Sequence, residues 1–289
     1  MANISIFAKR AFLSTQPNQE FNYHGTKPHQ GYLKRVSSII RADQIAEAIG
    51  AKLNPKKGYK KDVCVYVKPQ LDASNDFKFE GQSSYLDIID ELGYVSVLKK
   101  HPEVSVLVLS ESDYISLASV GITNKIVLIP QHHCNFGREK RTRSEVTTVG
   151  VIGNYKAFSY LPVDLKPRLA ERKMELLEFS EFFTRQDIID FYKKIDIQIV
   201  WRPYRKKLAN PLKIVNAASF GIPTIALDEI YFKEIGNCYL GVGDIDHFFV
   251  ELDRLRDSPT LYAAHSQLCL QKAEDYHIAK ITQLYNELK

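Results

Sequence analysis

Cysteine is scarce in this sequence, and no apolar run is long. The four cysteines among 289 residues, Cys64, Cys134, Cys238 and Cys269, are scattered and form no Cys-x-x-Cys pair. Such spacing predicts reduced, mostly buried thiols and argues against a disulfide framework. The longest apolar runs, such as KIVLIP at 125–130, have the length of a strand. A membrane span needs about 20 apolar residues, so we expect a globular chain without one.

Two signatures of cofactor and metal sites are also missing. The glycine-bearing stretch VGVIGN, at 149–154, does not match the Gly-x-Gly-x-x-Gly fingerprint, which weakens the hypothesis of a dinucleotide oxidoreductase. The stretch QHHCNF, at 131–136, holds residue types that ligate zinc. Adjacent ligands fit one tetrahedral ion poorly, and no second cluster supports them. We therefore expect no metal site.

The charge of the chain is positive and unevenly spread. The net charge is +5, and residues 1–70 alone hold twelve Lys and Arg against four Asp and Glu. A basic N-terminal half favours an anionic partner, such as a phosphate-bearing acceptor or an anionic membrane surface, although dispersed lysines also suit a solvated surface. Nucleic-acid binding is not expected, because no motif accompanies the charge. The first residues, MANISIFAKRAF, lack the features of a signal peptide, so we expect a cytoplasmic protein that contacts, at most, the inner face of the membrane.

Short apolar runs alternate with helical patterns along most of the chain. We expect strands at 4–8, 63–67, 104–109, 125–129, 148–152, 175–179, 197–201, 224–227 and 239–242. We expect helices at 33–49, 114–120, 165–172, 185–195, 211–220, 245–256 and 266–288, while 86–90 fits a strand or a helix. This alternation predicts an α/β fold built on parallel sheets.

A charged stretch divides the chain. GREKRTRSE, at 137–145, has no apolar periodicity and separates IVLIPQHHCNF from the new apolar run TTVGVIGN, as is typical of a linker. We expect an N-terminal domain over 1–137, a linker over 138–146 and a C-terminal domain over 147–265. The helical pattern over 266–289 is expected to cross back to the N-terminal domain.

The stretch NPLKIVNAASFGIPTIAL, at 210–227, has an unusual helix start. Asn210 suits the cap of a helix and Pro211 its first position. Lys213 then falls in the first turn, where a cation is unfavourable unless an anion completes the site. Lys213 and Asn216 share one face by their spacing. An anion-binding site is one interpretation, and a capped surface helix with a solvated lysine is the other.

The preceding stretch WRPYRKK, at 201–207, adds cations to the same place. It follows an expected strand, and ligands of parallel α/β sheets bind beyond the carboxyl ends of the strands. Arg202 lies closest to the strand end and is suited to bind a phosphate through two hydrogen bonds. Lys207, with Arg205 and Lys206, extends the cationic loop. These cations favour a phosphate-bearing ligand.

From about residue 147 to 242 the chain resembles the C-terminal half of GT-B-type glycosyltransferases, in particular the family-4-like group 1 enzymes. The matching stretches, in order, are VGVIGN, MELLEFSEF, RQDIIDFYKKIDIQIVW, KLANPLKIVNAASFGIPTIAL and YLGV. The resemblance implies two Rossmann-like domains with parallel sheets that face a cleft. It implies metal-independent transfer of a sugar from a nucleotide-diphosphate donor, without a cofactor. The C-terminal domain would hold the nucleotide sugar and the N-terminal domain the acceptor, a glycan, a lipid-linked molecule or another compound.

The same resemblance assigns roles to individual residues. Lys213 looks like the lysine that contacts the donor diphosphate, and Gly153 and Asn154 look like the turn that faces the cleft. The stretch 179–183, which begins with Phe179, resembles the loop near the nucleotide base. The expected donor-binding residues are therefore Gly153, Asn154, Phe179, Arg202, Lys207, Asn210, Lys213 and Asn216.

The chain departs from the family at an acidic pair. Many such enzymes carry two glutamates eight positions apart, and here Leu208 and Asn216 take their places. Asn216 retains the ability to hydrogen-bond a ribose hydroxyl but not a charged role. The departure leaves retaining and inverting chemistry both open, and also an inactive member.

Sugar transfer needs a base for the acceptor hydroxyl and cations for the leaving diphosphate. Candidate bases are His24, in the loop NYHGTKPHQG with His29, and Asp90, with Asp87 nearby. His132 or His133 is a further candidate, because both follow a strand beside the linker. Asp228 and Glu229, after another strand, are expected to touch the ligand or to cap the next helix.

Two alternatives to a glycosyltransferase stay open. Another enzyme of the GT-B fold, such as a sugar-nucleotide epimerase, would consume the nucleotide sugar without an acceptor. A non-catalytic nucleotide-sugar or glycan-binding module is favoured by the missing glutamates.

Overall fold

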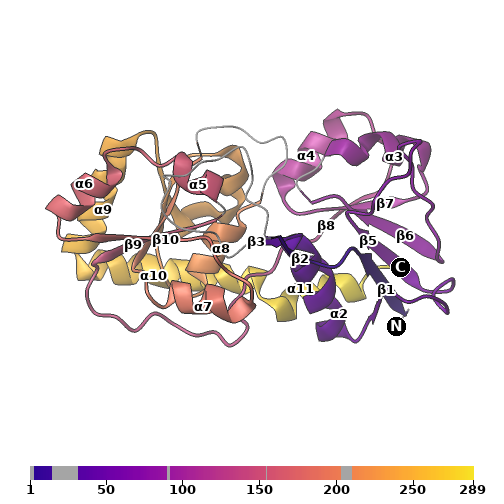
Figure 1. Ribbon diagram of the computed structural model, residues 1–289, viewed down its shortest axis with the longest axis horizontal. Coiled ribbons are helices and arrows are strands. Elements are labelled where there is room, and N and C mark those ends of the chain that lie inside the picture. Colours follow the sequence, from indigo (N-terminus) through magenta and orange to yellow (C-terminus); the bar gives the residue numbers. More distant parts are fainter. Residues whose placement is uncertain (1–2, 15–31, 90–91, 154, 203–209) are drawn as a thin grey trace.

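The computed structural model describes residues 3–14, 32–89, 92–153, 155–202 and 210–289. Two parallel sheets, each covered by helices, lie side by side along the long axis of the molecule (Figure 1). We call the sheet over residues 4–128 with its helices the N-terminal lobe, and the sheet over residues 148–242 with its helices the C-terminal lobe. A short antiparallel pair, β2 (Phe12–Ser14) and β3 (Tyr32–Lys34), completes the strands of the described chain.

The sheet of the N-terminal lobe has six strands in the order β4-β1-β5-β6-β7-β8. The strands are β1 (Ile4–Ala8), β4 (Lys52–Leu53), β5 (Val63–Val67), β6 (Ser83–Asp87), β7 (Ser105–Val108) and β8 (Ile126–Leu128). Every neighbouring pair is parallel. The central strand β5 reads VCVYV and is buried throughout, because helices or loops cover both faces of a parallel sheet.

The sheet of the C-terminal lobe has five parallel strands in the order β10-β9-β11-β12-β13. They are β9 (Thr148–Ile152), β10 (Glu175–Phe179), β11 (Ile197–Val200), β12 (Thr224–Leu227) and β13 (Tyr239–Val242). The chain goes outward from β9 to β10 and then returns to the other side of β9. The order of the strands therefore reverses between β9 and β11, which makes this point the topological switch of the sheet.

Helices surround both sheets. In the N-terminal lobe they are α1 (Val36–Ser38), the π-helix η1 (Ile39–Asp43), α2 (Gln44–Ile49), the 3-10 helix η2 (Leu92–Tyr94), α3 (Val95–Lys100) and α4 (Glu111–Ser119). In the C-terminal lobe they are α5 (Tyr155–Ser159), α6 (Leu165–Glu171), α7 (Arg185–Tyr192), α8 (Leu212–Ala218), the 3-10 helix η3 (Ile230–Cys238), α9 (Ile245–Asp257) and α10 (Pro259–Ala273).

Within the described residues, the chain passes between the lobes twice. The first crossing, residues 129–140, follows β8, and the second crossing is η4 (Glu274–Tyr276) with His277. The two crossings touch, because the N–H of His133 donates to the carbonyl of Tyr276 at 3.0 Å. Nε2 of His277 lies 3.1 Å from the carbonyl of Phe136. The lobes are therefore joined by two segments that hydrogen-bond to each other.

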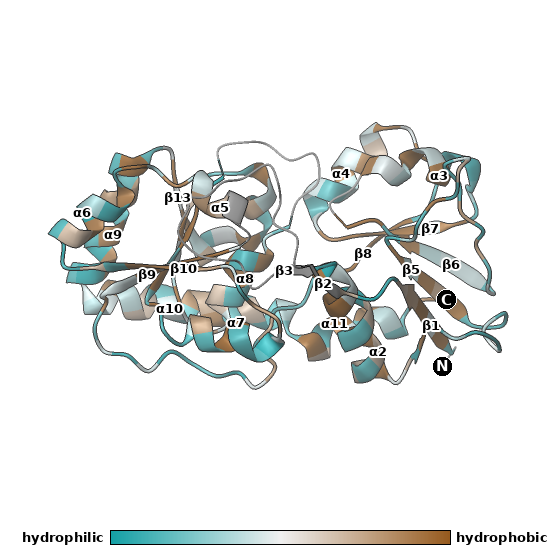
Figure 2. Cartoon of the chain, in the orientation of Figure 1, coloured by the Kyte–Doolittle hydropathy of each residue, from teal (hydrophilic) through white to brown (hydrophobic). Residues whose placement is uncertain are grey.

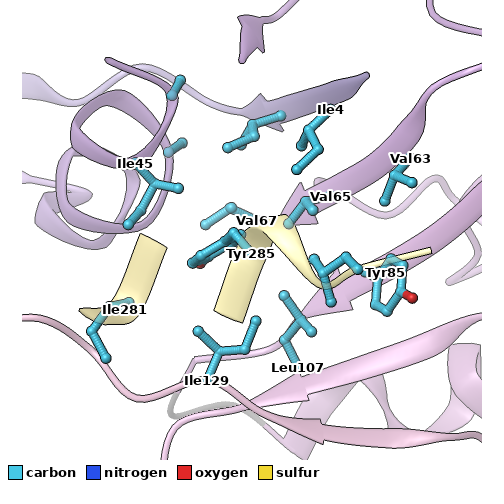
Figure 3. Close-up of a cluster of buried hydrophobic side chains, with 14 of the residues drawn as sticks. Ile4, Ile45, Val63, Val65, Val67, Tyr85, Leu107, Ile129, Ile281 and Tyr285 are labelled. Carbon is cyan, nitrogen blue, oxygen red and sulfur yellow. The ribbon is translucent and has the colours of Figure 1, made fainter. Parts of the chain in front are cut away.

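The last helix, α11 (Ile278–Asn286), belongs to the core of the N-terminal lobe. Ile281 and Tyr285 pack in one buried cluster with Ile45 of α2 and with residues of β1 and β5. Figure 3 shows both side chains among those of Ile4, Val65 and Leu107. The N-terminal lobe is thus completed by the far end of the chain (Figure 1).

The nine strand predictions are confirmed to within about one residue at each end. The undecided stretch at 86–90 begins with the end of strand β6. The helix predicted over 33–49 was wrong at its start, because residues 32–34 pair as strand β3 and helical structure begins at Val36. The helix predicted over 266–288 was also wrong, because His277 is extended and interrupts it. Nδ1 of His277 accepts the N–H of Ala279 at 3.1 Å and so starts a separate helix.

Hydrophobic residues gather on the strands of both sheets, and hydrophilic residues on the outward sides of the helices (Figure 2). Within the described ranges, no helix has both the length and the apolar character needed to cross a membrane.

The packing of α11 predicts a large effect of Ile281→Ala. The side chain is 1% exposed, so its removal leaves a cavity in the N-terminal core. We expect the free energy of unfolding to fall by about 3 kcal/mol in urea denaturation. Ile115→Ala, at a side chain that is 67% exposed, is the control and should change it by less than about 0.5 kcal/mol. Equal effects would contradict the placement of α11 in the core.

Candidate functional site

The switch point of the C-terminal sheet carries the first part of the candidate site. Strand β9 ends at Ile152 and Gly153 follows, while β11 ends at Val200 and is followed by Trp201 and Arg202. The N–H of Gly153 donates to the carbonyl of Phe179 at 3.0 Å, which fixes the turn at the sheet edge. Ligands of α/β sheets bind in the crevice beyond such a reversal of strand order.

Lys213 reaches this turn from helix α8. A Cβ atom placed on Gly153 would lie 2.9 Å from Nζ of Lys213 and 2.8 Å from Cβ of Ala157. Only glycine leaves room for this approach. The structure therefore brings together Gly153 and Lys213, two predicted donor-binding residues that lie far apart in the sequence.

The start of helix α8 differs slightly from the prediction. The helix runs over Leu212–Ala218, so Pro211 stands at the capping position. Asn210 still satisfies the first turn, because its Oδ1 accepts the N–H of Leu212 at 3.0 Å. The carbonyl of Lys213 accepts from Nε2 of the buried Gln198 at 3.0 Å, which ties the helix to strand β11. The backbone that carries Lys213 is therefore held rigidly.

Arg202 is paired within the protein. Its Nε donates to Oε1 of Glu229 at 3.0 Å, and its Nη2 donates to Oε2 of the same carboxylate. A phosphate group bound beside Arg202 would have to share the guanidinium with Glu229. Asp228, which precedes Glu229 in the sequence, accepts a hydrogen bond from the hydroxyl of Tyr239 at 2.7 Å.

Phe179 lies beside the site rather than in it. Its ring stacks on that of Phe191 of α7, with the ring centroids 5.2 Å apart and the planes 8° from parallel. The two aromatic residues that follow, Phe182 and Phe183, line a pocket between the lobes. Within the stretch 179–183, Phe182 and Phe183 thus line the pocket, whereas Phe179 packs against helix α7. A role of this stretch in binding the nucleotide base stays a prediction.

The pocket has a volume of about 110 Å³ and receives residues from both lobes. Its walls are mostly apolar and consist of Val36, Ile39, Ile40, Gln44, His132, His133, Cys134, Phe182, Phe183, Thr184, Arg185, Ile188, Leu212 and Asn216. Apolar walls with a few polar groups are typical of small-molecule sites, although a volume of this size suits one ring rather than a whole nucleotide sugar.

Asn216 is used to hold the first crossing. Its Oδ1 accepts the N–H of Cys134 at 2.8 Å, while Nη1 of Arg185 donates to the carbonyl of Cys134 at 2.9 Å. Two side chains of the C-terminal lobe thus satisfy both backbone groups of one buried residue. A contact between Asn216 and a ribose stays a prediction.

His132 lines the pocket but is 2% exposed. Its Nε2 lies 3.0 Å from the carbonyl of Ile40, and its Nδ1 lies 3.1 Å from that of His133. Burial lowers the pKa of His132 to about 4, against the effect of these two carbonyls. Burial, with the charges of His277 and His132, lowers the pKa of His133 to about 3. Both rings are therefore neutral at pH 7. The ring of His132 would nevertheless have to turn before one of its nitrogens could take the proton from the hydroxyl group of a sugar acceptor.

Asp87 lies in a buried ion pair. Its Oδ2 accepts from Nε of Arg41 at 2.7 Å, and both side chains are fully buried. Burial raises the pKa of Asp87, and the charge of Arg41 opposes this. Nη1 of Arg41 donates at 2.9 Å to the carbonyls of Ile129 and Pro130, at the start of the first crossing. Asp87 therefore anchors a structural arginine and does not face the pocket as a base.

Several predicted residues lie outside the described ranges. These are the candidate bases His24, His29 and Asp90, the turn residue Asn154, and the loop residues Arg205, Lys206, Lys207 and Leu208.

The QHHCNF stretch gives no metal site in the described structure. Throughout residues 3–14, 32–89, 92–153, 155–202 and 210–289, no three His, Cys, Asp or Glu side chains come together as a metal ion would need. Asp244 and Asp246 form an Asp-x-Asp pair in the sequence, but Asp244 caps helix α9 and Asp246 pairs with Arg168 at 2.7 Å. Independence of metal ions stays a prediction.

Sequence reasoning missed the wall of the pocket that comes from the N-terminal lobe. Ile39 and Ile40 lie in a π-helical turn, and Gln44 begins α2. Arg185 was also missed as a site residue. The apolar face of 36–44 was visible in the sequence, but only the packing of the two lobes shows what it contacts.

Solved structures share this arrangement of two sheets. The Anabaena protein HepE, in complex with UDP and glucose, superposes with a TM-score of 0.58 at 11% identity over 99% of both chains. TarM gives a TM-score of 0.57 at 14% identity, over 80% of this chain and 55% of its own length. Sucrose-phosphate synthase from Thermosynechococcus elongatus gives 0.55 at 13% identity, over 87% of this chain and 77% of its own. The chain therefore spans about half the length of TarM.

The fold is of the GT-B type, with two parallel α/β sheets in two lobes. No family model matches the chain, and the comparison with curated proteins found no match.

The burial of His132 and His133 predicts a loss of stability in acid. The pKa of histidine in an unfolded chain is about 6.5, so between that pH and 4 the unfolded chain binds protons that the folded state excludes. The free energy of unfolding should therefore fall as the pH is lowered through this window, by up to about 3 kcal/mol for each ring. Urea denaturation of the parent and His132→Gln at pH 7 and 4.5 measures this.

We expect the free energy of unfolding of His132→Gln to fall less between pH 7 and 4.5 than that of the parent, because the substitution removes one proton-binding group. An equal loss in the parent and in His132→Gln would contradict the burial argument.

Proposed function

We propose that the chain transfers a sugar from a nucleoside-diphosphate donor to a hydroxyl group of an acceptor. The observation that carries the proposal is the approach of Nζ of Lys213 to the turn at Gly153, at the switch point of the C-terminal sheet. The exposed side chain of Lys213 at this edge suits a diphosphate, which gains negative charge as it leaves. Arg202 supplies a second cation at the end of the neighbouring strand.

The likeness to HepE supports a uridine nucleotide as the first donor to test, because that protein was solved with UDP and glucose. We propose that Phe182, Phe183 and the remaining walls of the pocket hold the base of the donor. A flat ring fits a small apolar pocket with aromatic walls and a few amide groups. We expect no cofactor and no metal requirement, so transfer should persist in EDTA.

We assign the acceptor, and the general base that takes the proton of its hydroxyl group, to the N-terminal lobe. The structure of a point mutant of TarM holds Fondaparinux, α-GlcNAc-glycerol and UDP, which favours a glycan or a glycosylated polyol as the class of acceptor to test. His24 and Asp90 stay candidates for the base, and His132 needs a ring movement. Lys56, Lys57, Lys60 and Lys61 are exposed on one loop of this lobe and suit peripheral contact with an anionic membrane surface in the cytoplasm.

A non-catalytic nucleotide-sugar-binding module is the second candidate. It is favoured by Asn216, which takes the place of a carboxylate and accepts a backbone N–H with its oxygen. A sugar-nucleotide epimerase would use the same donor site without an acceptor. Incubation with a UDP-sugar distinguishes the transferase, the binding module and the epimerase. Transfer depends on added acceptor, epimerisation does not, and a binding module leaves the nucleotide sugar intact.

Lys213→Ala should weaken binding of a nucleoside diphosphate by about 1.5–3 kcal/mol, because it removes one charged hydrogen bond. Titration calorimetry with UDP measures the change. Lys233→Ala is the matched control, since Lys233 is an exposed lysine on η3. Unchanged affinity in a folded Lys213→Ala protein would remove the observation on which the function rests.

A thermal-shift screen in EDTA should show stabilisation by one class among UDP-, GDP-, dTDP- and ADP-sugars. NAD and NADP serve as controls. A ligand at about 100 times its dissociation constant stabilises the folded state by about 2.7 kcal/mol, which is measurable. Stabilisation by NAD or NADP alone would overturn the proposal in favour of redox chemistry.

A further inference from the structure

The lobes also meet away from the two crossings, where helix α4 of the N-terminal lobe contacts η3 of the C-terminal lobe. Helix α4 lies on the side of its lobe that is turned toward the C-terminal lobe (Figure 1). It begins after Ser110, whose Oγ accepts the N–H of Asp113 at 3.0 Å. The side chain of Ser110 thus caps one of the free N–H groups at this helix end, which leaves others in need of an acceptor.

The acceptor for the next N–H group comes from the opposite lobe. Oε2 of Glu234, on η3, accepts the N–H of Glu111 at 2.9 Å. A carboxylate at the N-terminus of a helix is favoured by hydrogen bonding and by the helix dipole. The contact is therefore an attraction between lobes that does not pass through either crossing.

Glu234 also lies next to the second crossing. Its Oε1 is 3.5 Å from the hydroxyl of Tyr276, and the carbonyl of Tyr276 accepts the N–H of His133 at 3.0 Å. His133 lines the pocket between the lobes. One carboxylate thus contacts helix α4 and, through Tyr276, the segment that forms a wall of the pocket.

Each lobe has hydrophobic clusters of its own, so this contact is not needed to fold either lobe. The clusters around β5 and β6 belong to the N-terminal lobe and α11, while those around β9 and β12 belong to the C-terminal lobe. Loss of Glu234 would leave the N–H of Glu111 to water. What the contact specifies is the position of one lobe relative to the other.

We propose that Glu234 is a positioning residue that caps helix α4 from the opposite lobe and holds the lobes in the arrangement that shapes the pocket. The effect on lobe geometry is independent of the proposed function, and only the effect on catalysis rests on it.

The geometric test measures the distance between the lobes by pulsed electron spin resonance. Spin labels are placed at Ala118→Cys on α4 and at Val163→Cys in the C-terminal lobe, both at exposed positions. The four native thiols are buried and resist labelling. We expect Glu234→Ala to broaden the distance distribution and move it to longer values. Glu234→Gln should keep the parent distribution, because an amide oxygen also accepts an N–H.

Glu171→Ala, at an exposed carboxylate on α6, is the matched control and should not change the distribution. A parent-like distribution in Glu234→Ala would overturn the proposal. The proposal would also be overturned if the distance distribution of Glu234→Gln were as broad as that of Glu234→Ala. In that case an oxygen that accepts the N–H of Glu111 would not be sufficient to hold the lobes in place.

Kinetics gives the second readout. Glu234→Ala should raise KM for the UDP-sugar by about tenfold with kcat changed less than about twofold, and Glu234→Gln should restore KM. If the parent neither binds nor uses nucleotide sugars but Glu234→Ala still widens the lobes, the proposed function fails and the role of Glu234 stands. If transfer is observed and neither the distance nor KM responds, the proposal for Glu234 fails alone.

Discussion

The hydrogen bonds around Cys134 are the constraint on which the rest of the molecule depends. Residues 131–135 of the first crossing are buried, so each of their backbone groups needs a partner inside the protein. Asn216 and Arg185 of the C-terminal lobe bind the two groups of Cys134, and Arg41 of the N-terminal lobe binds the carbonyls of Ile129 and Pro130. The lobes are thereby held to one segment from opposite sides, and the pocket lies where they meet.

This constraint limits which polar residues can take part in chemistry. Asp87 neutralises Arg41 in a fully buried pair, and the ring nitrogens of His132 face backbone carbonyls. Breaking such a pair would leave an uncompensated buried charge, which costs several kcal/mol. Lys213, which approaches Gly153 at the edge of the C-terminal sheet, stays the predicted contact for a ligand.

The local pattern was sufficient for nine of the strands and for the prediction of a cationic helix start. Parallel strands buried on both faces are short apolar runs, so β5 and β9 are visible without any tertiary information. Lys213 was predicted as a ligand contact because a cation in the first turn of a helix is unfavourable beside the positive end of the helix dipole. The strand β3 was missed because its partner β2 is remote in the sequence, and the break at His277 was missed because a histidine that caps a helix carries no clear local signal.

The sequence by itself determined the class of fold and the position of the cationic helix start, because apolar periodicity and helix capping act over a few residues. Only the tertiary structure decided the order of the strands, which places Gly153 and Arg202 at one switch point. It also decided that Asn216 and Asp87 serve the crossing and that Glu234 reaches the other lobe. The physical reason is that a polar side chain has the same local signature whether its partner is a ligand or a backbone group from a distant part of the chain.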